Sequence, residues 1–248
     1  MSRWLRRLSL LALGAAAMLA WAWLRPLEFE GLQERLRWRL NALWAQPDPA
    51  QLRYEAMLTA LQLRGEAALP AGALLLFGDS HLQSLPALPC RGVAWANFAI
   101  AGEPAERLAP RLAAYTSLQQ AGLLILLSGS NDLAQGASPE QAAARMAQVL
   151  SQLPVARPML LLALPPPAQA TALAQRQAAL NRRLAALCAQ RAACKFLPLT
   201  ELADGQGLLQ PGFAAGDGVH LSAAGYRRLS QVLAAALPPA AQCQATSP

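Results

Sequence analysis

The chain of 248 residues contains few charged side chains, only two histidines and a single lysine. Asp, Glu, Lys and Arg make up 14% of the residues, whereas about a quarter is usual in soluble domains. No cysteines and histidines cluster at metal-ligand spacing, and two histidines are too few for a zinc site. The Gly-x-x-x-x-Gly-Lys loop that cradles nucleotide phosphates is also missing. We therefore expect neither a metal nor a cofactor.

The positive charge is carried by arginine, because Lys195 is the only lysine and the formal net charge is +7. The arginines are scattered, with no run longer than a pair, so a nucleic-acid surface is not indicated. A compositional preference for arginine explains the charge, and we expect no nucleic-acid partner. The length suits one α/β domain plus an extension.

The N-terminus has the pattern of a membrane segment. Arg3, Arg6 and Arg7 precede an uncharged run over residues 8–24, which Arg25 closes. A spanning helix needs about 20 residues, and a signal-peptide core has about 7–15. Aromatic side chains near the ends of the run are typical of a membrane interface; they are Trp4, Trp21 and Trp23.

We predict that residues 1–25 form an uncleaved signal anchor, with a cleaved signal peptide and a buried core helix as the alternatives. Because the basic residues precede the apolar run, the N-terminus should stay cytoplasmic and the rest should be exported. The predicted location is therefore membrane-anchored, with the domain on the periplasmic or extracytoplasmic side.

Residues 26–69 have helical spacing of apolar residues, interrupted at Pro47-Asp48-Pro49. A second helix is expected from Ala50 to Glu66. This region is interpreted as a stalk or packing arm, and an oligomerising helix is the alternative.

From residue 70 the pattern changes to short apolar strands alternating with helices. Strands are predicted over residues 73–77, 93–98, 122–127, 159–163 and 194–199, and helices over 103–118, 138–152, 168–191 and 222–236. Ser138, Pro139 and Gln141 form a good helix start. Wholly apolar strands between helices predict a parallel sheet covered on both faces. The fold class is thus α/β, a three-layer α/β/α sandwich with five parallel strands over residues 70–238, followed by a tail at 239–248.

Two distant segments carry the elements of a nucleophilic site. Gly78-Asp79-Ser80 ends the first predicted strand, and Asp217-Gly218-Val219-His220 lies in the last loop. A hydrolytic serine needs a base and a carboxylate that holds the base in the right tautomer. His81 is poorly placed as the base because adjacent side chains diverge, which leaves His220, with Asp217 three residues before it.

Two further candidate residues follow predicted strands. Gly102 comes after the strand at 93–98, and Asn131 comes after the strand at 122–127, within Ser128-Gly129-Ser130-Asn131-Asp132. With Ser80, Gly102, Asn131 and His220 in this order, residues 73–237 resemble the SGNH (GDSL) hydrolase family. The resemblance implies a flavodoxin-like fold. Ligands bind such sheets at the carboxyl ends of strands, where three of these residues fall.

The resemblance also implies a role for each residue. Ser80 would be the nucleophile, His220 the general base and then acid, and Asp217 the group that orients His220. The oxyanion hole would comprise the backbone N–H groups of Ser80 and Gly102 and the side-chain amide of Asn131. Local explanations also exist: Ser80 as a helix cap, Gly102 as a turn with positive φ, and Asn131 as a turn cap.

The first motif departs from the family pattern, which usually continues with Leu, because His81 follows Ser80. We expect His81 to be a solvated residue at a helix start, with contact to the substrate as the alternative. Asp79 and Asp132 are expected to bond loop backbone, and Asn97 is a candidate brace for the second strand's end. A Gly-x-Ser-x-Gly elbow is absent because Leu82 stands at its last position, which argues against the α/β-hydrolase fold.

The four cysteines fit an oxidising compartment. Cys188 and Cys194 are spaced to join a helix end to the following strand, which would leave Cys90 and Cys243 as a second pair or free. Three pairings are possible, and the sequence does not choose among them.

These features favour a membrane-anchored extracytoplasmic serine esterase acting on a small-molecule, lipid or glycan ester. The alternatives are an O-acyltransferase acting on a cell-surface glycan and a non-catalytic binding module. The loops at residues 165–167 and 205–216 are expected to border the substrate pocket, since loops usually determine substrate choice.

Overall fold

The computed structural model describes residues 48–86, 88 and 92–237 of the chain. The predicted anchor and the first half of the predicted stalk lie outside these residues, as does the predicted tail. Within the described part of the chain, no helix is long and apolar enough to cross a membrane.

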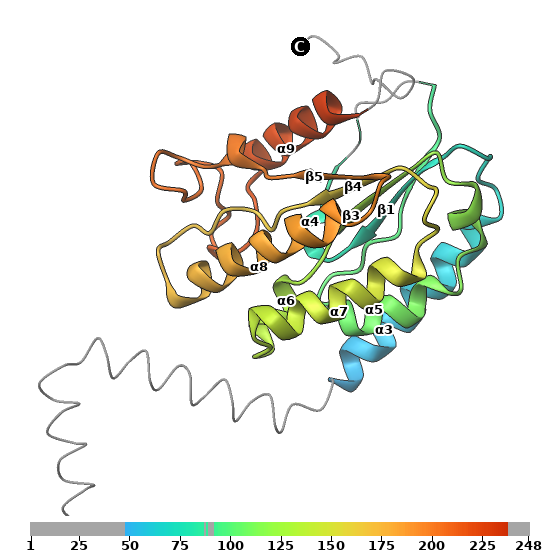
Figure 1. Ribbon diagram of the computed structural model, residues 1–248, viewed down its shortest axis with the longest axis horizontal. Coiled ribbons are helices and arrows are strands. Elements are labelled where there is room, and N and C mark those ends of the chain that lie inside the picture. The colour runs from blue at the N-terminus through green and yellow to red at the C-terminus, as the bar shows by residue number, and fades with distance from the viewer. Residues whose placement is uncertain (1–47, 87, 89–91, 238–248) are drawn as a thin grey trace, which may run out of the picture. The chain divides into compact units, whose positions relative to one another are not determined.

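A five-stranded parallel sheet forms the centre of the domain, with the strand order β2-β1-β3-β4-β5 (Figure 1). The strands are β1 (Leu74–Gly78), β2 (Trp95–Asn97), β3 (Leu123–Leu127), β4 (Met159–Leu162) and β5 (Cys194–Leu197). The central strands β1, β3 and β4 are buried along their whole length, while the edge strands are partly exposed. This explains why the central three are wholly apolar in sequence, and it confirms the predicted sheet.

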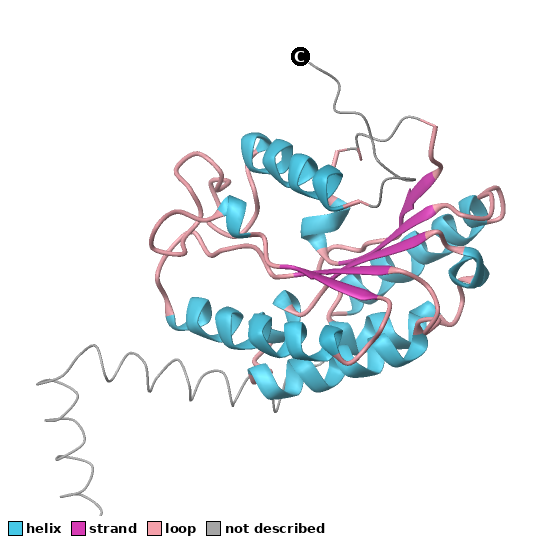
Figure 2. Cartoon of the chain, turned by 45° about the horizontal axis from the view of Figure 1, so that its top comes forward, coloured by secondary structure: helices cyan, strands magenta, loops and turns pink. Residues whose placement is uncertain are grey.

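Helices cover both faces of the sheet, which gives the predicted three layers (Figure 2). The longer helices are α3 (Pro49–Glu66), α5 (Ala105–Leu112), α7 (Pro139–Gln152), α8 (Ala172–Ala189) and α9 (Ala223–Ala236). In Figure 1, α9 lies on one face, and α5, α7 and α8 lie side by side on the other. The capping box predicted for Ser138 and Gln141 is present, and the helix predicted from Ala50 to Glu66 is confirmed as α3.

Some predicted boundaries were wrong. The helix expected over residues 103–118 ends at Leu112, and a 3₁₀ helix, η1 (Thr116–Gln120), follows it. The break occurs where Tyr115 adopts an extended backbone and turns its ring into the core against Phe77 and Phe98. The short helix α4 (Ser80–Gln83) agrees with the helix start expected at His81, whereas α6 (Ser130–Ala134) and the 3₁₀ helix η2 (Thr200–Leu202) were not predicted.

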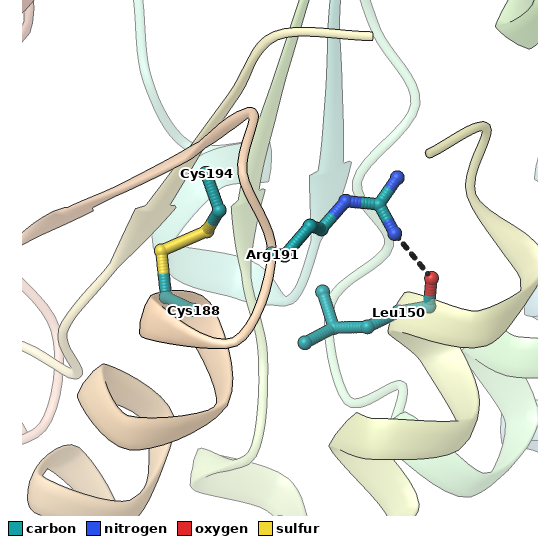
Figure 3. The surroundings of a disulfide bond; sticks show 4 residues. All are labelled: Leu150, Cys188, Arg191 and Cys194. Carbon is teal, nitrogen blue, oxygen red and sulfur yellow. Dashed lines mark hydrogen bonds between the residues drawn. A yellow bond between two sulfur atoms is a disulfide. The ribbon is translucent and has the colours of Figure 1, made fainter. Parts of the chain in front are cut away.

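A disulfide between Cys188 and Cys194 joins the last turn of α8 to the start of β5, with the Cα atoms 5.3 Å apart (Figure 3). Between the two cysteines, Arg191 donates hydrogen bonds of 3.0 Å to the carbonyls of Leu150 and Leu153 at the end of α7. The disulfide therefore stabilises the turn between α8 and β5, and Arg191 in this turn also anchors the end of α7. Cys90 and Cys243 lie outside the described residues.

Candidate active site

The turn after β1 presents Ser80 at the carboxyl edge of the sheet. Gly78 has φ of +150°, and a Cβ atom there would lie 1.9 Å from the carbonyl oxygen of Leu127. Only glycine therefore lets β1 approach β3 at this point. Asp79 then caps α4 by accepting the backbone N–H of His81 at 3.0 Å. The helix begins with Ser80, and the backbone N–H of Ser80 therefore has no acceptor within the helix.

The structure brings Ser80, His220 and Asp217 together in one chain of hydrogen bonds. His220 Nε2 lies 2.9 Å from Ser80 Oγ, and His220 Nδ1 lies 2.6 Å from Asp217 Oδ2. The other oxygen of Asp217 accepts the backbone N–H groups of Val219 and His220, each at 2.9 Å. Hydrogen bonding to the His220 ring and to these amides holds the pKa of Asp217 below its usual range, so Asp217 is an anion that accepts the Nδ1 proton.

This order of contacts has a chemical consequence. With Nδ1 donating to Asp217, the lone pair of the neutral ring sits on Nε2, which faces the Ser80 hydroxyl. Nε2 is therefore placed to take the hydroxyl proton as Oγ attacks. The side chains of His220 and Asp217 are 38% and 51% exposed, so solvent reaches this edge of the site.

Gly102 and Asn131 also lie together, Gly102 on the loop after β2 and Asn131 in the first turn of α6, which follows β3. Gly102 has φ of +77°, which agrees with the local explanation that a turn with positive φ requires glycine here. Asn131 donates from Nδ2 to the carbonyl of Glu103 at 3.2 Å, which places its amide beside the residue that follows Gly102. The Ile100 N–H donates to the Gly78 carbonyl at 2.8 Å, so the loop of Gly102 adjoins the turn of residues 78–80.

His81 is not solvated, and that expectation was wrong. The residue is only 4% exposed. Its Nδ1 lies 3.1 Å from Asp79 Oδ1, and its Nε2 lies 3.3 Å from the carbonyl oxygen of Val219. The reason is tertiary, since the loop of residues 217–220 folds over the ring and supplies the carbonyl that the side chain needs.

Both partners of the His81 ring are acceptors, so both ring nitrogens need a proton to satisfy them. Burial lowers the pKa of His81, but the hydrogen bond and charge of Asp79, the Val219 carbonyl and the Asp217 charge outweigh it and raise the pKa overall. When His81 is protonated, it forms a buried ion pair with Asp79 next to Ser80.

The two structural aspartates behave as predicted. Asp79 accepts the His81 N–H and, through its second oxygen, the Ser130 hydroxyl. Asp132 accepts a hydrogen bond of 2.8 Å from the backbone N–H of Ala105 and forms an ion pair with Arg145 at 3.1 Å. These bonds fix the loops that carry the candidate site.

Asn97 also braces its strand end, donating to the Leu82 carbonyl at 2.7 Å and accepting the Ala99 N–H at 3.1 Å. Sequence reasoning missed two glutamines. Gln83 accepts the Ala101 N–H at 2.7 Å, and Gln51 donates to the Ala101 carbonyl at 2.7 Å. No local pattern singles out these glutamines, because their partners lie 18 and 50 residues away.

A cavity of about 500 Å³ lies beyond the carboxyl ends of β4 and β5. Residues 165–167 line it, together with residues 206–208 of the glycine-rich stretch. Its lining does not include Ser80, Asp217 or His220, so its use as the substrate pocket stays a prediction. Among residues 48–86, 88 and 92–237, no three His, Cys, Asp or Glu side chains gather to hold a metal ion.

A family model described as GDSL-like lipase/acylhydrolase matches residues 76–228. No curated protein matches the chain. Among solved structures, a protein from Streptococcus pneumonia named for platelet activating factor has a TM-score of 0.66 and 22% identity, over 75% of this chain and 94% of that one. A GDSL-like lipase from Bacteroides thetaiotaomicron has a TM-score of 0.57 and 16% identity, over 72% of this chain and 96% of that one.

A protein of the lipolytic G-D-S-L family from Veillonella parvula has a TM-score of 0.54 and 17% identity, over 65% of this chain and 96% of that one. At these identities the solved structures establish a shared fold. The family model begins at residue 76, so helix α3 lies before the residues that it matches.

Proposed function

The chain belongs to the GDSL-like lipase/acylhydrolase family, whose members are ester-hydrolysing serine hydrolases, and from this premise we propose that it cleaves acyl esters with Ser80 as nucleophile. The observation that carries the proposal is the continuous contact from Ser80 Oγ through His220 to Asp217.

In the first half-reaction, Ser80 Oγ attacks the ester carbonyl carbon while His220 Nε2 takes the hydroxyl proton. Asp217 stabilises the imidazolium through Nδ1 without taking its proton. The tetrahedral intermediate collapses, the bond to the alkoxy oxygen breaks, and His220 gives its proton to the leaving alcohol. Ser80 is left as an acyl ester.

The second half-reaction repeats these steps with water as the nucleophile. His220 takes a proton from the water, the hydroxide adds to the acyl carbon, and the carboxylic acid leaves as Ser80 recovers its proton. The partial exposure of the His220 and Asp217 side chains leaves water free access.

The developing oxyanion would be bound by the N–H groups of Ser80 and Gly102 and by the amide of Asn131. One Nδ2 hydrogen of Asn131 is used by the Glu103 carbonyl, which orients the amide and leaves its second hydrogen for the oxyanion. Each such donor contributes on the order of 3 kcal/mol to the transition state.

The test is hydrolysis of p-nitrophenyl esters, from acetate to palmitate, by the detergent-purified full chain. Ser80→Ala should abolish turnover while the fold persists. Ser117→Ala is a matched control, because its buried hydroxyl lacks a partner in the described structure and lies beyond the opposite end of β1. Turnover by Ser80→Ala close to that of the wild type would refute the assignment.

Membrane anchoring and export are part of the same proposal. They are supported by the basic residues, the uncharged run and the interfacial tryptophans of residues 1–25. The full chain should fractionate with membranes, resist extraction by high salt and dissolve in detergent. Recovery of the uncleaved chain in the soluble fraction would contradict the anchor.

A further inference from the structure

We propose that helix α3 belongs to the catalytic apparatus, with Gln51 as a positioning residue that sets the direction of the Gly102 N–H. The inference rests on the proposed function, because it assumes that this N–H binds the oxyanion. It assigns a catalytic contribution to a helix outside the residues that the family model matches.

Gln51 controls the peptide that joins Ala101 to Gly102. Its Nε2 donates to the Ala101 carbonyl oxygen at 2.7 Å. A peptide is planar and trans, so its C=O and the N–H of the next residue point in opposite directions. Holding the Ala101 oxygen toward α3 therefore holds the Gly102 N–H away from α3.

This peptide needs an external hold because Gly102 is a glycine with φ of +77°. Glycine populates positive and negative φ about equally, so its own backbone does little to prevent reorientation of the peptide. A Cβ atom at Gly102 would lie 2.7 Å from Gln51 Nε2. The glutamine is thus packed directly against the one residue whose conformation it fixes.

A buried carboxylate fixes the Gln51 amide in turn. Gln51 Nε2 also donates to Glu55 Oε1 at 2.9 Å, so both neighbours of this nitrogen are acceptors and the amide has one satisfactory orientation. Glu55 is 7% exposed and forms two 2.8 Å hydrogen bonds with Arg107. Arg107 reaches the Gly102 carbonyl at 3.3 Å, which restrains the next peptide as well.

The other side of Ala101 is held through the same helix. Gln83 accepts the Ala101 N–H at 2.7 Å and donates to the Tyr54 hydroxyl at 2.9 Å. Gln51, Tyr54 and Glu55 lie at i, i+3 and i+4 of α3, so one face of the helix supplies all three side chains. Because Gln83 ends the short helix that Ser80 begins, this face of α3 connects the loop of Gly102 to the turn that carries Ser80.

The test separates transition-state stabilisation from substrate binding in the full chain. Gln51→Ala should lower kcat about tenfold, part of the 10²–10³ expected for complete loss of one oxyanion donor, with KM little changed. The inhibition constant of a trifluoromethyl ketone, which forms a tetrahedral adduct, should rise by the same factor. The matching unfluorinated ketone should bind as it does to the wild type.

Gln62→Ala is the matched control on the same helix. Gln62 bonds the Tyr115 hydroxyl at 2.5 Å and Arg111 at 3.2 Å, so its removal loosens α3 without releasing Ala101, and kcat should be retained. Gln51→Lys should also keep most of the activity, because an ammonium can donate to the Ala101 carbonyl and pair with Glu55. This variant replaces Gln51→Ala as the test if Gln51→Ala does not fold.

Unchanged kcat and inhibition constant in Gln51→Ala would overturn the inference, as would equal losses in Gln51→Ala and Gln62→Ala or an inactive but folded Gln51→Lys. These outcomes leave the proposed function standing as long as Ser80→Ala remains inactive. Turnover by Ser80→Ala would instead remove the premise itself.

Discussion

Replacing His81 with leucine, the residue usual at this position in the family, should destabilise the protein and slow turnover. The change removes the proton donors that face Asp79 Oδ1 and the Val219 carbonyl. Asp79 is completely buried, so its charge would lose its counter-ion inside the protein. The loop that carries His220 would also lose the bond between its Val219 carbonyl and the side chain of residue 81.

The magnitude follows from what Asp79 keeps. Removing one partner of a buried ion pair costs about 3–5 kcal/mol. Asp79 would retain the backbone N–H of residue 81 and the Ser130 hydroxyl, which favours the lower end, about 3 kcal/mol. For a domain of this size, such a loss corresponds to a fall in Tm of roughly 6–12 °C.

The pH dependence has a definite sign. The pKa of His81 is raised in the folded protein above its ordinary value of 6.5, so the protonated pair stabilises fully below that value. The contribution is lost as the pH rises through the folded pKa. The groups facing the ring are Asp79, Val219 and Asp217, and the His220 ring has its centroid 5.6 Å away.

Thermal unfolding of wild type and His81→Leu at several pH values measures these effects. The stability difference should be largest in mild acid and shrink in alkali. Adding Asp79→Asn to His81→Leu should recover part of the loss, because no charge would then be left buried. A Tm within about 2 °C of wild type in mild acid, or a difference that grows with pH, would refute the ion pair.

Three further changes give sharp expectations. Asn131→Ala should lower kcat by about 10²–10³ with little effect on KM; an unchanged steady-state rate would remove this amide from the oxyanion hole. Asp217→Asn should lower kcat by up to about 10⁴, because the amide can stabilise the wrong tautomer of His220, and a rate near wild type would show that His220 needs no anionic partner. Replacing Cys188 and Cys194 by serine should cost about 2 kcal/mol, the chain-entropy value for a loop of six residues, with esterase kinetics unchanged; an unaltered urea midpoint would show that the bridge does not contribute.

Much of the fold was predictable because its signals are local. The central strands are buried on both faces, so they are continuous apolar runs such as Leu123–Leu127. The start of α7 was predictable because its capping box lies within four residues. The end of the helix over residues 103–118 was not, because the Tyr115 ring finds its place in the core only in the folded protein.

The candidate site divides in the same way. Ser80, Gly102 and Asn131 could be placed near one another from sequence because parallel strands end at a common edge, and Asp217 lies three residues from His220. The environment of His81 could not, since its Nε2 partner, Val219, lies 138 residues away. His81, the residue next to Ser80, was expected in solvent and is instead enclosed by the loop that carries His220.

The sequence alone determined the layered α/β architecture, the family and the residues that could act as nucleophile, base and oxyanion donors, because backbone periodicity and short motifs encode them. Tertiary structure alone decided how these residues are held. A glutamine on α3 reaches a carbonyl 50 residues away, and the buried His81 contacts a carbonyl 138 residues away. Such contacts depend on where whole segments pack, which no local pattern specifies.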